Sequence, residues 1–139
     1  MNVAFLLLPK SRVAHLTEGT DFRRGMEKLR RCGHTSIPVI ARDGRYLGCL
    51  TEGDCLWNLL GMGSLNARAL DRVMVEDIVS PRVPAIPVTA TVKTIMPRVL
   101  ALTQDYVPVI DDRRMFVGIV TKQRIFECYN HTPGGRILQ

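Results

Sequence analysis

The sequence contains two copies of one pattern, displaced by 70 residues with no insertion or deletion between them. The run SIPVI at residues 36–40 returns as YVPVI at residues 106–110, and YLGCLT at 46–51 returns as FVGIVT at 116–121. Repetition at a fixed period marks a duplicated supersecondary unit. Two copies are too few for a solenoid, so we expect a closed pseudo-twofold pair in which each copy covers the apolar face of the other. Such a pair forms two related clefts along its axis.

The composition is typical of a folded domain that contacts anions. The chain has 139 residues, 46% of them apolar and 23% charged, which suffices for one domain with a buried core. A net charge of +6 and a pI near 9.5 favour a nucleotide, a nucleic acid or an acidic protein as partner. The charge is uneven, because residues 1–31 hold seven Lys or Arg against three Asp or Glu.

The cysteines and the N-terminal segment exclude several classes. Cys32, Cys49, Cys55 and Cys128 lack C-x-x-C spacing, and the histidines add no ligand spacing to them, so we expect reduced thiols in a cytoplasmic protein and no metal site. The apolar run at residues 3–8 is too short for a membrane span and has no basic residue before it, as a signal peptide would. We expect it to pack on the core or on a partner chain, with no role for a membrane.

Each copy is predicted to form strands and helices in the order β-α-β-β-α, which makes the fold class α/β. In the first copy we expect strands at 13–16, 37–40 and 46–50, a helix capped by Thr20 or Asp21 that reaches Cys32, and a helix from Thr51 to Leu60. In the second we expect strands at 83–86, 107–110 and 116–120 and helices at 92–102 and 122–129, with Pro97 kinking the former or shifting its start. The predicted division is repeat 1 at 8–62, a connector at 63–80 with a helix at 70–79, repeat 2 at 81–130 and a flexible tail at 131–139.

The sharpest motif is Gly48-x-x-Thr51-x-x-Asp54 at a strand-to-helix junction. Threonine followed three residues later by an acid resembles a capping box, which stabilises a helix by about 1 kcal/mol. A helix N-terminus also attracts phosphate, and an aspartate beside it can accept hydrogen bonds from ribose hydroxyls. Both interpretations stay open for this copy.

The second copy favours a ligand. Its counterpart is Thr121-Lys122-Gln123-Arg124, where Arg124 replaces the aspartate and Lys122 follows the threonine. Cations in the first turn of a helix oppose the macrodipole, and a bound anion would reverse the sign of that effect. The alternative is that both side chains simply point into water.

The segment before each strand proline is the other candidate. Pro38 donates no ladder hydrogen bond, so the backbone just before it can approach a ligand. Thr35 and Ser36 offer hydroxyls there, and Ile37 offers an apolar wall for a base. The matching segment, with Asp105 and the bulky ring of Tyr106, is a poorer host for phosphate.

The repeat of Gly-x-x-x-h-Pro-Val followed by h-x-Gly-h-h-Thr-x-x-Asp, where h is apolar, resembles a pair of CBS domains, also called a Bateman module, over about residues 8 to 130. In that family each cleft takes its threonine helix from one repeat and its pre-proline strand from the other. The resemblance implies a first cleft of Arg12, Ala14, Thr35, Ser36, Ile37, Thr121, Lys122, Gln123 and Arg124. It implies a second cleft of Arg82, Pro84, Tyr106, Val107, Thr51 and Asp54.

Within the family, the chain is similar to small stand-alone bacterial CBS proteins that act as cyclic di-AMP receptors. Those proteins place basic residues directly after the second threonine, where this chain has Lys122, whereas Gln123 departs from a doubly basic pattern. The resemblance therefore leaves cyclic di-AMP, AMP, ADP and ATP open as ligands. We expect the first cleft to take a doubly phosphorylated ligand such as cyclic di-AMP. We expect the second to be empty or to hold a singly charged adenosine compound weakly.

The chain is interpreted as a regulatory adenine-nucleotide sensor without a cofactor, because the sequence shows no nucleophile-base pair, metal spacing or carboxylate dyad. The family resemblance implies a homodimer formed through helices, with output to a protein effector. One alternative is a nucleic-acid-binding protein that uses the basic first helix. Against it, no aromatic residue is interleaved with those arginines and no RNA- or DNA-binding motif is present. The other alternative is a structural dimer with empty clefts.

Overall fold

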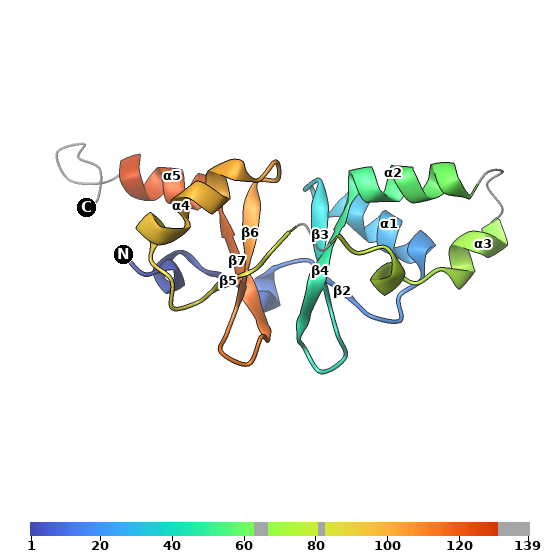
Figure 1. Ribbon diagram of the computed structural model, residues 1–139, viewed down its shortest axis with the longest axis horizontal. Coiled ribbons are helices and arrows are strands. Elements are labelled where there is room, and N and C mark those ends of the chain that lie inside the picture. Colours follow the sequence, from blue (N-terminus) through green and yellow to red (C-terminus); the bar gives the residue numbers. More distant parts are fainter. Residues whose placement is uncertain (63–66, 81–82, 131–139) are drawn as a thin grey trace. The chain divides into compact units, whose positions relative to one another are not determined.

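The computed structural model describes residues 1–62, 67–80 and 83–130, and the chain divides into two compact units (Figure 1). Unit 2 comprises residues 14–83, and unit 1 comprises residues 84–139 together with residues 1–13. The predicted order β-α-β-β-α is confirmed in both repeats, and with it the α/β fold class. Arg82 and the predicted tail at 131–139 lie outside the described residues.

Unit 2 is built on a three-stranded sheet in the order β2-β3-β4. Strand β2 (Leu16–Thr17) runs parallel to β3 (Ser36–Ile40), which pairs antiparallel with β4 (Tyr46–Thr51). The predicted turn at Asp43-Gly44 joins the last two strands, as Asp-Gly between apolar runs favours. The first strand is shorter than the predicted 13–16, because only Leu16 and Thr17 pair with β3.

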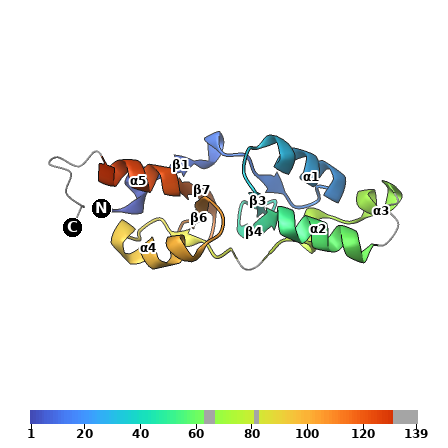
Figure 2. The same ribbon diagram turned by 90° about the horizontal axis from the view of Figure 1, so that it is seen from above.

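Two helices cover one face of this sheet (Figure 2). Helix α1 (Phe22–Arg31) begins after Asp21, whose carboxylate accepts a hydrogen bond from the Arg24 amide at 2.9 Å. Its inward stripe of Phe22, Gly25 and Leu29 is buried. Helix α2 (Glu52–Gly61) begins after Thr51 and buries Cys55. The sheet and both helices therefore enclose one core.

The connector forms two short elements where one helix at 70–79 was expected. Helix α3 (Ala67–Arg72) ends early, and a 3-10 turn, η3 (Val75–Asp77), follows it. The Asp77 carboxylate accepts a hydrogen bond from the Met74 amide at 3.1 Å, which caps a new turn. Val75 and Ile78 are then buried in the core of unit 2.

Unit 1 repeats the plan with a four-stranded sheet in the order β1-β7-β6-β5. Its repeat consists of β5 (Ile86–Pro87), α4 (Val92–Ala101), β6 (Tyr106–Ile110), β7 (Phe116–Thr121) and α5 (Lys122–Asn130). Strand β5 is again shorter than predicted, because only two residues pair with β6. Apolar residues of both helices and of the last three strands form the core.

Pro97 lies inside α4 and does not shift the start of the helix. The helix still begins at Val92, where the Thr91 hydroxyl accepts a hydrogen bond from the Thr94 amide at 3.3 Å. Proline removes one intrahelical donor, while Val92, Ile95 and Val99 bury the inward face. Packing of that face outweighs the lost bond.

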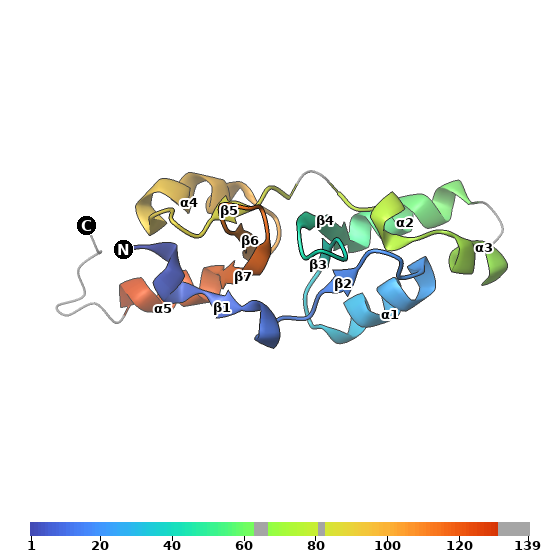
Figure 3. The ribbon, with the colours of Figure 1, turned by 90° about the horizontal axis from the view of Figure 1, so that it is seen from below.

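The N-terminal segment packs on the core of unit 1. The 3-10 helix η1 (Val3–Leu6) buries Val3 and Leu6 there, as expected for the apolar run. Strand β1 (Leu8–Pro9) pairs antiparallel with β7 (Figure 3), and the 3-10 turn η2 (Lys10–Arg12) packs against the same strand. Residues 8–13 were assigned to repeat 1 from the sequence, yet they belong to the same unit as repeat 2.

Both sheets accept a close backbone neighbour at the same glycine of the repeat. A Cβ on Gly48, at φ +145°, would lie 2.9 Å from the Ser80 carbonyl oxygen. A Cβ on Gly118, at φ +153°, would clash with the Leu8 carbonyl oxygen. Only glycine adopts this φ without strain. Glycine is therefore required at this position of the repeat, because in each unit another backbone segment packs against the strand there.

We predict that Gly118→Ala destabilises unit 1 by about 2 kcal/mol, because strain and the clash with the β1 backbone act together. The melting temperature should fall by about 6 °C or more. Gly53→Ala is the control, since a Cβ there meets no atom within 4 Å. It should leave the melting temperature equal or higher. Equal melting temperatures for the two variants in calorimetry would contradict the close approach.

Candidate functional site

The last helix of each repeat begins with the same threonine cap. In α2, Thr51 Oγ1 accepts a hydrogen bond from the Asp54 amide at 3.0 Å and donates to Asp54 Oδ2 at 2.8 Å. In α5, Thr121 Oγ1 accepts a hydrogen bond from the Arg124 amide at 3.1 Å. The capping interpretation of the Gly48-x-x-Thr51-x-x-Asp54 motif is therefore confirmed, and Thr121 caps the second copy in the same way.

The same helix starts are joined to the residues that precede the strand proline. The Glu52 amide donates to the Thr35 carbonyl at 3.0 Å, and the Lys122 amide donates to the Asp105 carbonyl at 2.8 Å. Each repeat thus brings its own two candidate segments together. Combination of segments from different repeats, which the resemblance implies, stays a prediction.

These hydrogen bonds reduce the number of backbone N–H groups that are left to bind an anion. The first and third amides of each helix, those of Glu52 and Asp54 and of Lys122 and Arg124, already donate within the chain. A phosphate at such a helix start must therefore rely more on side chains than on the bare helix terminus.

The side chains at the two helix starts have opposite charge. The first turn of α2 carries Glu52 and Asp54, whereas the first turn of α5 holds no acid and carries Lys122 and Arg124. The backbone around them is the same. Of these two helix starts, that of α5 has the charge that an anion requires.

Both cations of α5 bind backbone carbonyls, which sequence reasoning missed. Lys122 Nζ donates to the Leu102 oxygen at 2.6 Å, and Arg124 Nε donates to the Leu6 oxygen at 3.0 Å. Leu102 caps the C-terminus of α4, the negative end of that helix dipole. This contact therefore offsets the unfavourable interaction of Lys122 with the dipole of its own helix. Its presence alone does not require a bound anion.

The residues of the predicted first cleft lie in both units. In unit 2, Ala14 and Thr35 are exposed, whereas Ser36 is 2% exposed and Ile37 belongs to the buried core. Ile37 is 0% exposed and pairs with Leu50 of β4, so neither its side chain nor its backbone is accessible in unit 2. In unit 1, Arg12 is exposed in the turn that packs against β7, the strand that leads into the start of α5. The α5 residues are half-buried (Thr121, Lys122) or exposed (Gln123, Arg124).

The second predicted cleft also has two buried members among the described residues. Tyr106 and Val107 are each 1% exposed, and Val107 belongs to the core of unit 1. Thr51 and Asp54 are half-buried and bonded to each other. Pro84 is exposed, and Arg82 lies outside the described residues.

Cys55 lies one residue beyond Asp54 but is a poor nucleophile. Burial raises the pKa of its thiol to about 11, and the negative charges of Asp54 and Glu52 add to that shift. The thiol therefore stays protonated at neutral pH. Among the described residues, no three His, Cys, Asp or Glu side chains are placed to bind a metal ion, and no helix is long and apolar enough to cross a membrane.

Solved structures with this fold include proteins with bound nucleotides. CbpB in complex with c-di-AMP is 24% identical, with a TM-score of 0.84 over 94% of this chain and 85% of that chain. CbpB of Listeria monocytogenes in complex with c-di-AMP is 23% identical, with a TM-score of 0.80 over 92% and 94%. CBSX2 in complex with AMP is 19% identical, with a TM-score of 0.74 over 91% and 94%. These likenesses establish the fold.

The sequence itself matches the family profile of the CBS domain twice, at residues 7–61 and 75–131. No curated protein sequence matches the chain. The two matched segments contain both pre-proline strands and both threonine-capped helices described above. The chain belongs to the CBS-domain family, with two CBS domains in tandem.

Proposed function

We propose that the protein is a regulatory adenine-nucleotide sensor, with cyclic di-AMP as the ligand of its first predicted cleft. The observation that carries the proposal is the contrast between the two helix starts. The same backbone arrangement carries the acids Glu52 and Asp54 in unit 2. In unit 1 it carries Lys122, Gln123 and Arg124. The nucleotides bound by CbpB and CBSX2 support the ligand class. The proposed role is binding and signalling rather than catalysis.

The side chains of unit 1 account for a preference for a doubly charged ligand. Lys122 and Arg124 are held by carbonyls, and their remaining donor hydrogens can meet phosphate oxygens. In unit 2, the exposed Thr35 adds a hydroxyl beside the start of α2, to which its own carbonyl is bonded. Asp54 suits a ribose better than a phosphate, because it is an acceptor.

We predict that Thr35→Ala weakens cyclic di-AMP binding in calorimetry and that Asp54→Ala leaves it nearly intact. The Thr35 bond to Glu52 uses the main chain, so the alanine variant loses only a hydroxyl and a methyl group. One lost hydrogen bond to a charged ligand should cost about tenfold in affinity. The reverse pattern would show that the clefts are assigned the wrong way round.

A thermal-shift panel of AMP, ADP, ATP, cyclic di-AMP and cyclic di-GMP identifies the nucleotide. A ligand at about a hundred times its dissociation constant stabilises the fold by about 2.7 kcal/mol. We expect cyclic di-AMP to give the largest shift. A larger shift with AMP, ADP or ATP would favour the alternative of an AMP/ADP/ATP-sensing module. No shift with any nucleotide would contradict a sensor.

We further propose a homodimer that passes its signal to a protein effector. Helix α2 exposes three large apolar side chains within one turn, with 67% of Leu56, 74% of Trp57 and 74% of Leu60 accessible. Phe126 takes the position of Leu56 in α5 and is 69% exposed. Exposed apolar residues grouped in this way typically mark a protein contact. A second copy of the chain is the proposed occupant.

Trp57→Glu combined with Leu60→Glu should convert the dimer into a monomer in light scattering, because two charges would be buried without partners. Trp57→Phe combined with Leu60→Met is the matched control and should stay dimeric. The dimer proposal is wrong if the wild-type protein is monomeric at micromolar concentration. It is equally wrong if the glutamate variant keeps the mass of a dimer.

A further inference from the structure

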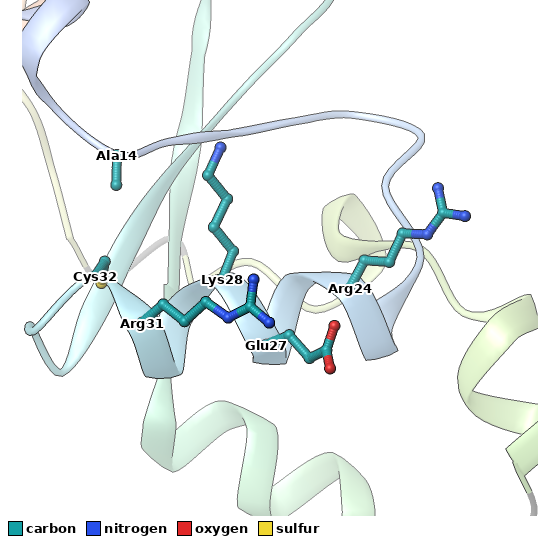
Figure 4. Close-up of a pocket in the computed structure, with 6 residues that line it drawn as sticks. All are labelled: Ala14, Arg24, Glu27, Lys28, Arg31 and Cys32. Carbon is teal, nitrogen blue, oxygen red and sulfur yellow. The ribbon is translucent and has the colours of Figure 1, made fainter.

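Helix α1 carries a stripe of three cations on one face, which we call the basic stripe: Arg24, Lys28 and Arg31. Their i, i+4 and i+7 spacing aligns them along about 10 Å of the helix. Together with Ala14, Glu27 and Cys32 they line a pocket of about 430 Å³ (Figure 4). The pocket lies within unit 2, and of its residues only Ala14 is among those predicted to bind nucleotide.

The fold holds the basic stripe toward solvent. The opposite face of α1 is buried through Phe22, Gly25 and Leu29, so the helix cannot rotate. Lys28 Nζ donates to the His15 carbonyl at 2.7 Å, and Figure 4 shows it pointing toward the segment of Ala14. The Arg24 side chain is 80% exposed, with its Nε 3.4 Å from the Asp21 carboxylate. Three cations against the single carboxylate of Glu27 leave the pocket positive.

The duplication shows that the fold does not need this charge. Helix α4 occupies the same position in its repeat, and the residues 70 positions later are Thr94, Arg98 and Ala101. Only one of the three is a cation. Helix stability is a weak reason for Arg24 as well, because it lies in the first turn of α1, where the dipole disfavours a cation, and its contact with Asp21 leaves its side chain 80% exposed. The stripe is therefore a feature of one helix and not of the repeat.

We propose that the basic stripe binds an acidic helical segment of a partner protein, an interaction that goes beyond nucleotide sensing. Carboxylates at i, i+4 and i+7 on the partner match the spacing of the three cations. Ala14 and Cys32 give the pocket an apolar floor that suits a peptide side chain, and none of the lining residues is an aromatic on which a base could stack.

The test is fluorescence anisotropy of the full chain with a fluorescein-labelled helical peptide that carries glutamates at i, i+4 and i+7. At about 0.15 M salt, the Debye length of about 8 Å screens distant charge. Arg24→Thr combined with Arg31→Ala installs the residues that α4 has at these positions. This variant should bind the peptide about tenfold more weakly.

Lys93→Ala combined with Arg98→Ala is the matched control, since it removes two positive charges from α4. It should keep peptide affinity within about twofold. Equal losses in the two variants would mean that only net charge matters, and would overturn the proposal. Tighter binding of a single-stranded RNA oligonucleotide than of the peptide, lost in the stripe variant, would overturn it in favour of a nucleic-acid surface.

Two further readouts keep the outcome interpretable. If the circular dichroism spectrum of the double variant differs from wild type, Arg31→Ala alone replaces it, with a loss of about threefold expected. Cyclic di-AMP binding is measured on the same samples and should be unchanged. Failure of the nucleotide proposal would remove that binding from every sample, whereas failure of this proposal would leave peptide affinity equal in wild type and stripe variant.

Discussion

One backbone hydrogen bond in each repeat determines where polar side chains can gather. It runs from the first amide of the last helix to the carbonyl that precedes the proline strand, at 3.0 Å between Glu52 and Thr35 and at 2.8 Å between Lys122 and Asp105. Because main-chain atoms make this bond, the side chains on both sides of it can change without loss of the arrangement. The capping threonines, Thr51 and Thr121, hold the helix in register with it. The two repeats thus share one backbone arrangement, the shared frame, and differ in the polar side chains that it carries.

Because both repeats form the same fold, the residues that differ between them can be compared directly. Where unit 2 has acids at the start of α2, unit 1 has cations at the start of α5. Where α1 has the basic stripe, the three matching positions of α4 hold one cation, Arg98. Neither difference follows from the fold, since both copies form it. The first difference supports the proposed nucleotide site and the second supports the proposed surface for an acidic partner.

The sequence was sufficient to predict features that depend on local signals. The Asp43-Gly44 turn, the Asp21 and Thr51 caps and the apolar stripes lie within short segments, and each predicted its element. Contacts between distant segments carry no such signal. The pairing of Leu8 with Ile119 and the bond from Lys122 to the Leu102 carbonyl could not be read from residue patterns. The burial of Ser36 and Ile37 was missed because all five residues of β3 are buried, without the alternation that identifies a solvent face.

Hydrogen–deuterium exchange with and without cyclic di-AMP tests the central claim most directly, because it reports on both helix starts in one sample. We expect added protection at the amides of residues 122–124 and at Thr35. The amides of residues 52–54, in the same backbone arrangement with acidic side chains, should exchange at unchanged rates. Protection confined to residues 52–54, or equal at both helix starts, would contradict the account that side-chain charge, and not the shared frame, selects the ligand.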